Sequence, residues 1–460
     1  MSSPSSDSPR ARARTLATSA FAYRLALGAL VALAFALTAW NAYAAPGYLG
    51  YDSEQNVHHA HDIVYEWEFK DPNVYGDISY KPPGFYLIAG SLLFVGDQLN
   101  VEDPRSVVQF ADGLLAVASL IVVLLLARTL WPRRRALHLL AGGFFLFMPL
   151  IPKTAAMFHP ALLGTFLSAL ALLLAARMLE HRRFDVRSSV VLLAVLLGGL
   201  FTLSAGIWTY AAVVGGILAA GLGRHSTWRQ LRVPLVVLVG IAVAAAIPWY
   251  AYQASERGTP FFSGGTNSTE PFLERRPAAF YTDTGLPEVF SRPIRPAFTN
   301  LLLPTAYTET WGDYFGIWAW AAETPPDARA LRELRQQSWL GLLPTALGIA
   351  GWLALLYAAG RAMAGRRLRQ AGLVPVALLP GIAVIGFLYY AIGHFSVDGD
   401  LLKGTYMITA TPAWAIAFAY AADRVRRLPV VGLPAVLILA GSALLSLPFL
   451  VYHSPLWGLL

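Results

Sequence analysis

Long apolar stretches alternate with short polar loops from about residue 22 to residue 450. A stretch of about 20 predominantly apolar residues can cross the hydrocarbon core of a bilayer as an α-helix. The pattern therefore predicts an all-α polytopic membrane protein with about 11 transmembrane helices, of which the pair at 137–152 and 160–177 is short, interrupted by proline and open to a tilted or re-entrant arrangement. The predicted spans are 22–44, 106–129, 137–152, 160–177, 189–204, 206–223, 232–251, 339–360, 372–392, 404–422 and 430–450.

Two segments interrupt this pattern, residues 45–105 and 253–338. Neither is apolar enough to span, and both are too long to be simple connections, so we expect them to fold together as a cap over an outward-facing cavity. Within the first, the apolar run from 84 to 95 is too short to span and predicts an interfacial or re-entrant helix. The predicted organisation is a disordered cytoplasmic N-terminus (1–21), a transmembrane module (22–252), the outer cap (253–338) and C-terminal transmembrane helices (339–460).

Charge predicts the orientation of the chain. The arginine-rich loops at 133–135, 182–183, 366–367 and 424–427 fall on one side of the predicted spans, and nearly all the carboxylates and every lysine fall on the other. The positive-inside rule places the arginine side, with the N-terminus, in the cytoplasm. The alternative for the first span is a signal peptide cleaved after Ala42-Tyr43-Ala44, but its apolar run is longer than usual for such a peptide.

Composition excludes several classes of function. Only 13% of the residues are charged and 56% are hydrophobic, so the net charge of +8 reflects loop arginines rather than affinity for nucleic acid. Cysteine is absent, which excludes disulfides and thiolate metal sites. No phosphate-binding loop, hydrolase elbow or dinucleotide fingerprint is present, so the sequence gives no support for soluble nucleotide chemistry.

The densest polar cluster follows the first predicted helix. Asp52 and Glu54 lie just outside the membrane, where an acid gains little from packing, and Asp52 is the candidate general base. Glu54 is a second catalytic candidate, although an acid in the first turn of a helix also stabilises that helix. Residues 53–69 predict an amphipathic helix with Glu54, His58, His61 and Asp62 on one face. We favour a hydrogen-bonded polar face over a metal site, and expect no metal or other cofactor.

Lysines on the outer side are candidates for binding an anion. Lys81 lies in Lys81-Pro82-Pro83-Gly84, which disfavours helix and then starts one, and a cation beside a helix N-terminus favours phosphate. Lys153 and Lys403 lie at other outer helix ends and could converge on the same anion. The alternative is that each lysine extends to lipid headgroups.

Aromatic and polar side chains of both outer segments are candidates for binding a sugar or an acceptor. Rings with polar tips suit sugar faces, but they also suit the membrane interface, and the sequence favours neither reading. The candidates are His58, His59, Tyr86, Trp311 and Asp313.

The order of these features resembles the GT-C superfamily of membrane glycosyltransferases, most closely the branch of protein O-mannosyltransferases and lipid A aminoarabinose transferases. Asp52 falls where that branch has its first-loop acid, and the segment 80–86 (Tyr-Lys-Pro-Pro-Gly-Phe-Tyr) falls where it has a Pro-Pro-Leu-x-Tyr-like element. Leu402-Lys403-Gly404-Thr405-Tyr406 resembles a basic-x-x-Tyr element before a late helix. The chain departs from the pattern in separating Asp52 from Glu54 by Ser53, and in having Thr405 where arginine is common.

The resemblance implies a glycosyltransferase in the cell membrane with its site on the outer face. The donor would be a polyprenyl-phosphate sugar, the acceptor a hydroxyl of a lipid, glycan or protein, and the transfer inverting. Asp52 would be the base, and Lys81, Lys403 and Tyr406 would bind the donor phosphate. The alternative is a transporter or flippase of a lipid-linked or anionic solute, which predicts ionisable residues deep in the spans, where Asp112 is the clearest.

Overall fold

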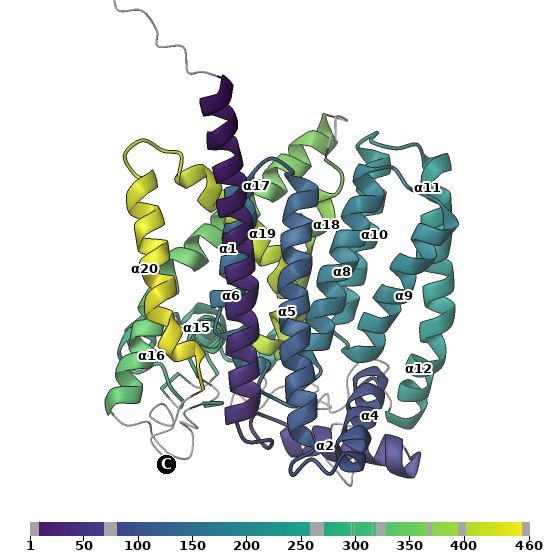
Figure 1. Cartoon of the computed structure of the whole chain (residues 1–460). Coiled ribbons are helices and arrows are strands. Elements are labelled where there is room, and N and C mark those ends of the chain that lie inside the picture. The colour runs from purple at the N-terminus through teal and green to yellow at the C-terminus, as the bar shows by residue number, and fades with distance from the viewer. Residues whose placement is uncertain are drawn as a thin grey trace, which may run out of the picture.

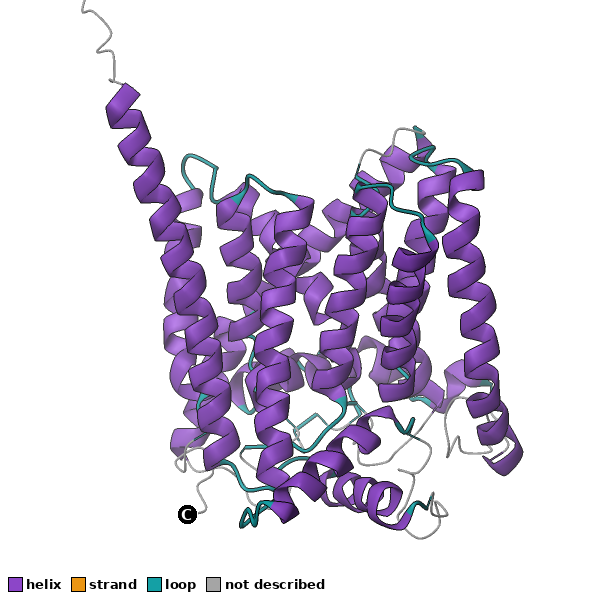
Figure 2. Ribbon diagram, turned by 45° about the vertical axis from the view of Figure 1, so that its right-hand side comes forward, coloured by secondary structure: helices purple, strands orange, loops and turns teal. Residues whose placement is uncertain are grey.

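The computed structural model describes residues 9–68, 81–257, 271–318 apart from 296, 299 and 315, and then 328–365, 370–393 and 402–452. Within these ranges every regular element is a helix and no strand occurs, which confirms the predicted all-α class (Figure 2). Residue 80 of the Lys-Pro-Pro element and residues 1–8 of the predicted disordered N-terminus lie outside the described residues.

A bundle of long helices forms the body of the molecule (Figure 1). Each predicted span corresponds to one helix or to two or three consecutive helical elements, because a continuous apolar run in lipid satisfies its backbone polar groups only as a helix. The bundle consists of α1 (Pro9–Ala44), α5 (Arg105–Leu130), α6 (Arg135–Phe147), α7 (Leu150–Thr154), α8 (Ala161–Glu180), α9 (Val186–Thr202), α10 (Gly206–Leu222), α11 (Trp228–Leu235), η3 (Val236–Ile241), α12 (Ala242–Arg257), α16 (Ala328–Leu340), α17 (Leu342–Ala364), α18 (Leu373–Gly393), α19 (Thr411–Val425) and α20 (Gly432–Leu450).

Within the described ranges, seven helical segments are long and apolar enough to cross a membrane, judged by length and composition, and α6, α9 and α10 are shorter apolar helices. The chain is therefore a multi-pass membrane protein, but the predicted count of eleven spans is not confirmed. The clearest difference lies at 404–422, where a 3-10 helix, η5 (Gly404–Ala410), precedes α19. Pro412 lies in the first turn of α19, where its missing N–H leaves no helical hydrogen bond unmade.

The first helix starts earlier than predicted. We expected disorder up to residue 21, whereas α1 begins at Pro9. Alanine and arginine make up seven of the eleven residues 10–20, and both have high helix propensity, which accounts for the difference.

Small residues allow the central helices to approach closely. A side chain at Gly351 of α17 would collide with the backbone carbonyl of Ala417 in α19. A side chain at Gly113 of α5 would lie 3.2 Å from Cβ of Thr38 in α1. Close backbone approach at small residues is a principal source of helix packing in lipid, where the hydrophobic effect between helices is weak.

Short helices from both outer segments cover one end of the bundle, at the bottom of Figure 1. Tyr51, from the first segment, packs in one buried cluster with Tyr314 and Trp318 from the second. The two segments therefore meet, as the cap prediction required. Their elements are α2 (Ser53–His61), η1 (Asp62–Glu66), α4 (Gly84–Gln98), η4 (Phe272–Arg275), α13 (Ala278–Thr282), α14 (Leu286–Ser291) and α15 (Leu302–Trp311).

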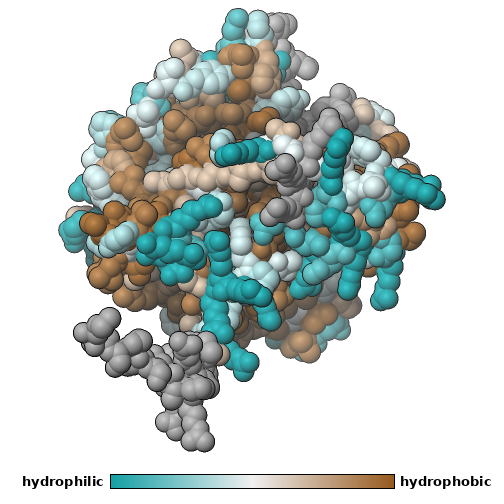
Figure 3. Space-filling view, turned by 90° about the horizontal axis from the view of Figure 1, so that it is seen from above, coloured by the Kyte–Doolittle hydropathy of each residue, from teal (hydrophilic) through white to brown (hydrophobic). Residues whose placement is uncertain are grey.

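The other end of the bundle is polar and rich in arginine. Figure 3, which looks down on this end, shows hydrophilic side chains gathered over it. Asp423 is buried there and accepts charge-assisted hydrogen bonds from Arg426 at 2.9 Å and from Arg427 at 2.6 Å. Arg134, from the loop before α6, lies 3.4 Å from the same carboxylate and so ties that loop to α19.

The first prediction concerns orientation. Green fluorescent protein inserted after Arg135 should fluoresce, and alkaline phosphatase inserted at Thr284 should be active, because the positive-inside rule predicts that the arginine-rich end faces the cytoplasm. The measurement is cell fluorescence and phosphatase activity, normalised to the amount of each fusion. The control exchanges the two reporters between the two insertion sites. If only the exchanged fusions are active, the orientation is the opposite of the one predicted.

Candidate active site

A tight turn after α1 places Asp52 over the end of the bundle. Gly50 has φ of 100° and Asp52 has φ of 59°, both in the left-handed region. Aspartate adopts this region more readily than most residues, but a non-glycine residue held there is uncommon and such positions cluster at functional sites. The turn ends at the N-terminus of α2, for which Asp52 is the N-cap residue without using its side chain as a cap. The carboxylate is therefore left for other partners.

Those partners are two lysines from distant parts of the sequence. The ammonium group of Lys81 lies 3.1 Å from one carboxylate oxygen of Asp52, and that of Lys403 lies 3.7 Å from the other. Lys81 precedes α4, and Lys403 is the N-cap residue of η5. Both lysine side chains are almost buried, with 12% and 8% of their surface exposed, whereas the Asp52 side chain is 33% exposed, so water and salt reach the ion pairs only from the carboxylate side. The lysine convergence predicted from the sequence occurs for these two residues.

Asn56, which the sequence analysis missed, holds Lys81 in place. Its Oδ1 accepts hydrogen bonds from Lys81 Nζ at 3.3 Å and from the Tyr86 hydroxyl at 2.8 Å. Its Nδ2 donates to the Phe158 carbonyl at 3.1 Å. Asn56 follows Asp52 by one helical turn, so an amide at that spacing inside a predicted polar helix was the available signal.

His159 is a second residue that the sequence analysis missed. Its imidazole accepts a hydrogen bond at Nδ1 from the Ala161 backbone N–H at 3.2 Å, which leaves the ring proton of the neutral form on Nε2. Burial, followed by the charge of Lys81, lowers the pKa of His159 to about 3, so the ring is neutral at physiological pH. Its backbone N–H donates to Asp112, the acid that the transporter alternative singled out. Asp112 therefore has a local structural partner.

Asp52, Lys81, His159 and Lys403 line one cavity of about 80 Å³. Helix ends and loops from distant parts of the chain contribute to its wall, and Tyr51, whose ring lies 4.4 Å from the Lys403 ammonium, forms one side. The predicted phosphate residue Tyr406 also lines it. The lining is Tyr51, Asp52, Lys81, Pro82, His159, Pro160, Leu203, Ser204, Ala205, Trp208, Tyr390, Lys403, Thr405 and Tyr406.

The electrostatic environment keeps Asp52 ionised. Burial alone would raise the pKa of its carboxyl group, but the charges of Lys81 and Lys403 outweigh burial and hold the pKa well below its usual value. The pKa of Lys81 shifts the other way, lowered first by burial and then by the like charge of Lys403, with Asp52 opposing both effects. The side chains that line the cavity include two cations and one carboxylate, which suits an anionic ligand, and the buried acid Glu309 lies behind them, near Tyr51.

Other predicted site residues do not line this cavity. Glu54 and His58 are exposed on the outer face of α2. His59 is buried and packs edge-to-face against Tyr86, with ring centroids 4.5 Å apart. Tyr86 itself is fully buried, so the structure shows it supporting Asn56 rather than facing the cavity. Asp62 was expected on the polar face but is buried, because the π-helical turn that begins there changes the helix phase.

Trp311, Asp313 and Lys153 have structural partners instead. Lys153 Nζ lies 2.6 Å from a carboxylate oxygen of Asp313, with both side chains almost fully buried. Asp313 also accepts hydrogen bonds from the backbone N–H groups of Ile317 and Trp318. Trp311 donates from its indole N–H to Thr345 at 2.8 Å. The expected convergence of Lys153 on the same anion as Lys81 is therefore wrong, because Asp313 already neutralises it.

One group on the outer surface has the residue types of a metal site. Potential ligand atoms of His61, Asp62 and Glu66 all lie within 4.8 Å of one another. His61 and Glu66 are exposed, and His61 stacks on the ring of Tyr65 with centroids 4.3 Å apart. The group is not part of the cavity lining, and the expectation of a metal-free site stays a prediction.

The chain matches no protein-family model, and no curated protein sequence matches it. Its fold does match solved membrane proteins. An oligosaccharyltransferase from Archaeoglobus fulgidus, in complex with zinc and sulfate, aligns with a TM-score of 0.55 at 14% identity over 92% of this chain and 53% of that one. AglB from the same organism, with an inhibitory peptide and a dolichol phosphate, aligns with a TM-score of 0.53 at 13% identity over 93% and 56%. ArnT from Cupriavidus metallidurans, bound to undecaprenyl phosphate, aligns with a TM-score of 0.49 at 16% identity over 93% and 73%.

The chain thus spans about half the length of the two archaeal oligosaccharyltransferase structures. Their alignments cover 92% and 93% of this chain. The resemblance found in the sequence is confirmed at the level of architecture: this chain is a multi-pass membrane protein with the GT-C fold.

Proposed function

We propose that this chain is an integral-membrane glycosyltransferase that transfers a sugar from a polyprenyl-phosphate donor to an acceptor hydroxyl on the outer face, with inversion. The observation that carries the proposal is the carboxylate of Asp52 between two nearly buried lysines, in one cavity at the end of a GT-C bundle. The solved structure with a dolichol phosphate supports the class of donor by analogy of fold.

The charges of the cavity suit such a donor. A sugar joined to a polyprenyl chain through one phosphate is a phosphodiester with a single negative charge. The lining offers the ammonium groups of Lys81 and Lys403 against the carboxylate of Asp52, so the bound donor would make the three side chains and the phosphate neutral together. After transfer, the phosphate monoester carries a second negative charge and Asp52 has gained the acceptor proton. The charges of the three side chains and the phosphate therefore still sum to zero.

In the proposed reaction, Asp52 removes the proton from the acceptor hydroxyl as its oxygen bonds to the anomeric carbon. The bond between that carbon and the phosphate oxygen breaks, and the electron pair stays on the phosphate. Lys81 and Lys403 stabilise the charge that develops there, which is the main electrostatic requirement of the step. His159, with its proton on Nε2, supplies a neutral hydrogen-bond donor from the same wall.

Donor binding must rearrange the ion pairs. In an inverting displacement the base and the leaving phosphate lie on opposite sides of the anomeric carbon, whereas Asp52 now lies 3.1 Å from Lys81. We therefore propose that the donor enters between them, so that the lysines move from the carboxylate to the phosphate. Loss of the lysine contacts would raise the pKa of Asp52 and make it a stronger base only once the donor is bound.

A neighbouring apolar groove is suited to the polyprenyl tail. It has a volume of about 510 Å³ and is bounded by α15, α17, α18 and α19. Gly404, which lines the groove, adjoins Lys403, which lines the charged cavity. The rings of Trp352 and Trp414 form part of its wall, with centroids 5.6 Å apart. A lipid chain in this groove would place its phosphate at the lysines.

The base is tested by Asp52→Asn, which keeps the shape of the side chain and removes the carboxylate. Transfer from a polyprenyl-phosphate sugar to acceptor should fall by roughly 100-fold or more if Asp52 is the general base. The matched control is Glu54→Gln, two residues away and exposed, which should keep transfer close to wild type. Near-normal turnover in Asp52→Asn at equal protein level would remove Asp52 from the mechanism.

The phosphate site is tested by Lys81→Gln, Lys403→Gln and the double variant. Each single change should weaken donor use, and the losses should be non-additive because both lysines act on one developing charge. Lys→Arg at each position should restore part of the activity. Transfer rates against donor concentration provide the measurement. Wild-type donor kinetics in all three variants would end the phosphate-site proposal.

The ion pairs also predict a dependence of stability on pH. Because the folded-state pKa of Asp52 is lowered, its ion pairs stabilise the fold above about pH 4, the ordinary pKa of aspartate, and lose this effect as the pH falls through the folded-state pKa. Lys81→Gln removes the largest opposing charge and so raises that folded-state pKa. The difference in melting temperature between wild type and Lys81→Gln should be widest near about pH 7 and narrow below about pH 4. A difference that is constant with pH would show that the charge of Asp52 does not stabilise the fold.

A further inference from the structure

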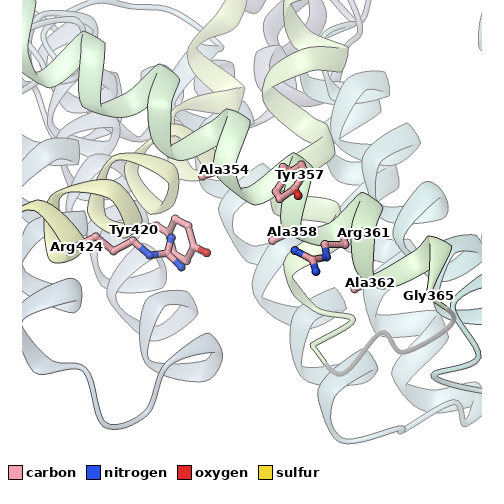
Figure 4. A pocket seen from close by; sticks show the side chains of 8 residues that line it. All are labelled: Ala354, Tyr357, Ala358, Arg361, Ala362, Gly365, Tyr420 and Arg424. Carbon is pink, nitrogen blue, oxygen red and sulfur yellow. The ribbon is translucent and has the colours of Figure 1, made fainter.

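A groove of about 830 Å³ lies between the C-terminal ends of α17 and α19, at the opposite end of the bundle from Asp52 (Figure 4). One wall carries Tyr357, Arg361 and several alanines of α17, and the other carries Tyr420 and Arg424 of α19. Neither arginine belongs to the cavity described above, and the proposed transfer reaction does not use this groove.

The groove follows from the way the two helices pack. Both helices begin toward the Asp52 end of the bundle, and their backbones are in close contact where Gly351 faces Ala417. Arg361 and Arg424 come later in each helix, about 10–15 Å beyond that contact at the usual rise per residue. The helices therefore separate toward the arginine-rich end, and the space between them opens in the direction of the polar surface.

The walls combine a small apolar floor with two cations. Ala354, Ala358 and Ala362 follow one another at the spacing of a helical turn along α17, which leaves room for a chain beside them. Figure 4 shows the guanidinium groups of Arg361 and Arg424 pointing into the space from opposite walls. An apolar floor that ends between two cations matches a ligand with an apolar chain and an anionic head.

The two cations are not neutralised within the part of the chain that the structure describes. Asp423, the adjacent buried acid, pairs with Arg134, Arg426 and Arg427 and not with Arg424. Arg424 instead stacks on the ring of Tyr420, with its guanidinium carbon 3.6 Å from the ring centroid. Stacking holds the guanidinium plane and leaves its N–H edges for an oxyanion, which arginine binds with two parallel hydrogen bonds.

We propose that this groove binds an anionic phospholipid, with the phosphate between Arg361 and Arg424 and an acyl chain along the alanine face of α17. A lipid rather than a free anion is favoured because both walls belong to helices of the membrane bundle. The ring of Tyr357 is 68% exposed beside the groove, and exposed aromatic rings with a polar tip favour the headgroup region. The proposal does not depend on the glycosyltransferase activity and would stand if that activity were absent.

Native mass spectrometry of the purified chain tests the proposal. Phosphatidylglycerol and phosphatidylcholine with the same acyl chains are titrated in parallel, and the wild type should retain one phosphatidylglycerol more tightly than phosphatidylcholine. Arg361→Gln combined with Arg424→Gln should weaken that retention by about tenfold or more, since both charge-assisted contacts to the phosphate are lost. The matched control is Arg187→Gln combined with Arg224→Gln, exposed arginines at the same end of the bundle, which should retain phosphatidylglycerol as the wild type does.

A second pair of variants separates a groove from a merely basic surface. Ala358→Trp fills the groove and leaves every charge in place, so it should also weaken retention, whereas Ala350→Trp, exposed on the same helix outside the groove, should not. Unchanged retention in Ala358→Trp, or in the double arginine variant, would overturn the proposal. If soluble glycerol phosphate displaced phosphatidylglycerol at equal concentration, the headgroup alone would account for binding. That result would contradict the proposal that the groove binds a lipid.

Discussion

The contact on which the candidate site depends is the carboxylate of Asp52 between the ammonium groups of Lys81 and Lys403, at 3.1 and 3.7 Å. It joins the turn after α1, the loop before α4 and the start of η5, which are far apart in the sequence. Removing charged groups from water is costly, and an ion pair of this kind is weak support for stability by itself. Its place in a cavity whose lining holds two cations and one carboxylate suits the binding of an anionic ligand.

The fold provides the rigidity that this contact needs. Lys81 is held by Asn56, which is itself held by Tyr86 and by the Phe158 carbonyl. The His159 backbone is fixed on buried Asp112 of α5. The polar network therefore extends from the cavity into the helix bundle, where close packing at small residues leaves little freedom to move. Such support keeps the lysines near the position that a phosphate would occupy before the donor arrives.

Charged side chains have different partners at the two ends of the bundle. At the Asp52 end, carboxylates and lysines pair across distant segments, and the remaining acid–lysine pair, Lys153 with Asp313, is buried and structural. At the arginine-rich end, Asp423 pairs with three arginines, whereas Arg424 lies beside an open groove. Arginine stays charged in any environment and suits a permanent headgroup site, whereas lysine can adjust its pKa when buried and suits a site whose charge changes during a reaction.

Much of the architecture follows from the sequence alone. The apolar runs predicted the helices because a backbone in lipid has no partner but itself, and the position of Asp52 after the first run predicted that it would lie beside the membrane. The split of 404–422 into η5 and α19 and the early start of α1 were missed, since hydropathy does not register a change of helix type or the helix propensity of polar residues.

Only the tertiary structure decided which polar residues meet. From its position on the outer side, Lys153 could have joined Lys81 and Lys403 at one anion, but Asp313 of the second outer segment is brought to it and pairs with it instead. Asn56 and His159 carried no distinctive motif, and their places beside Lys81 and Asp52 depend on packing between α2, α4 and the loop before α8. A local pattern determines the type of element and its membrane boundary, because these depend on neighbouring residues. The composition of a cavity depends on contacts between distant segments, which no local pattern contains.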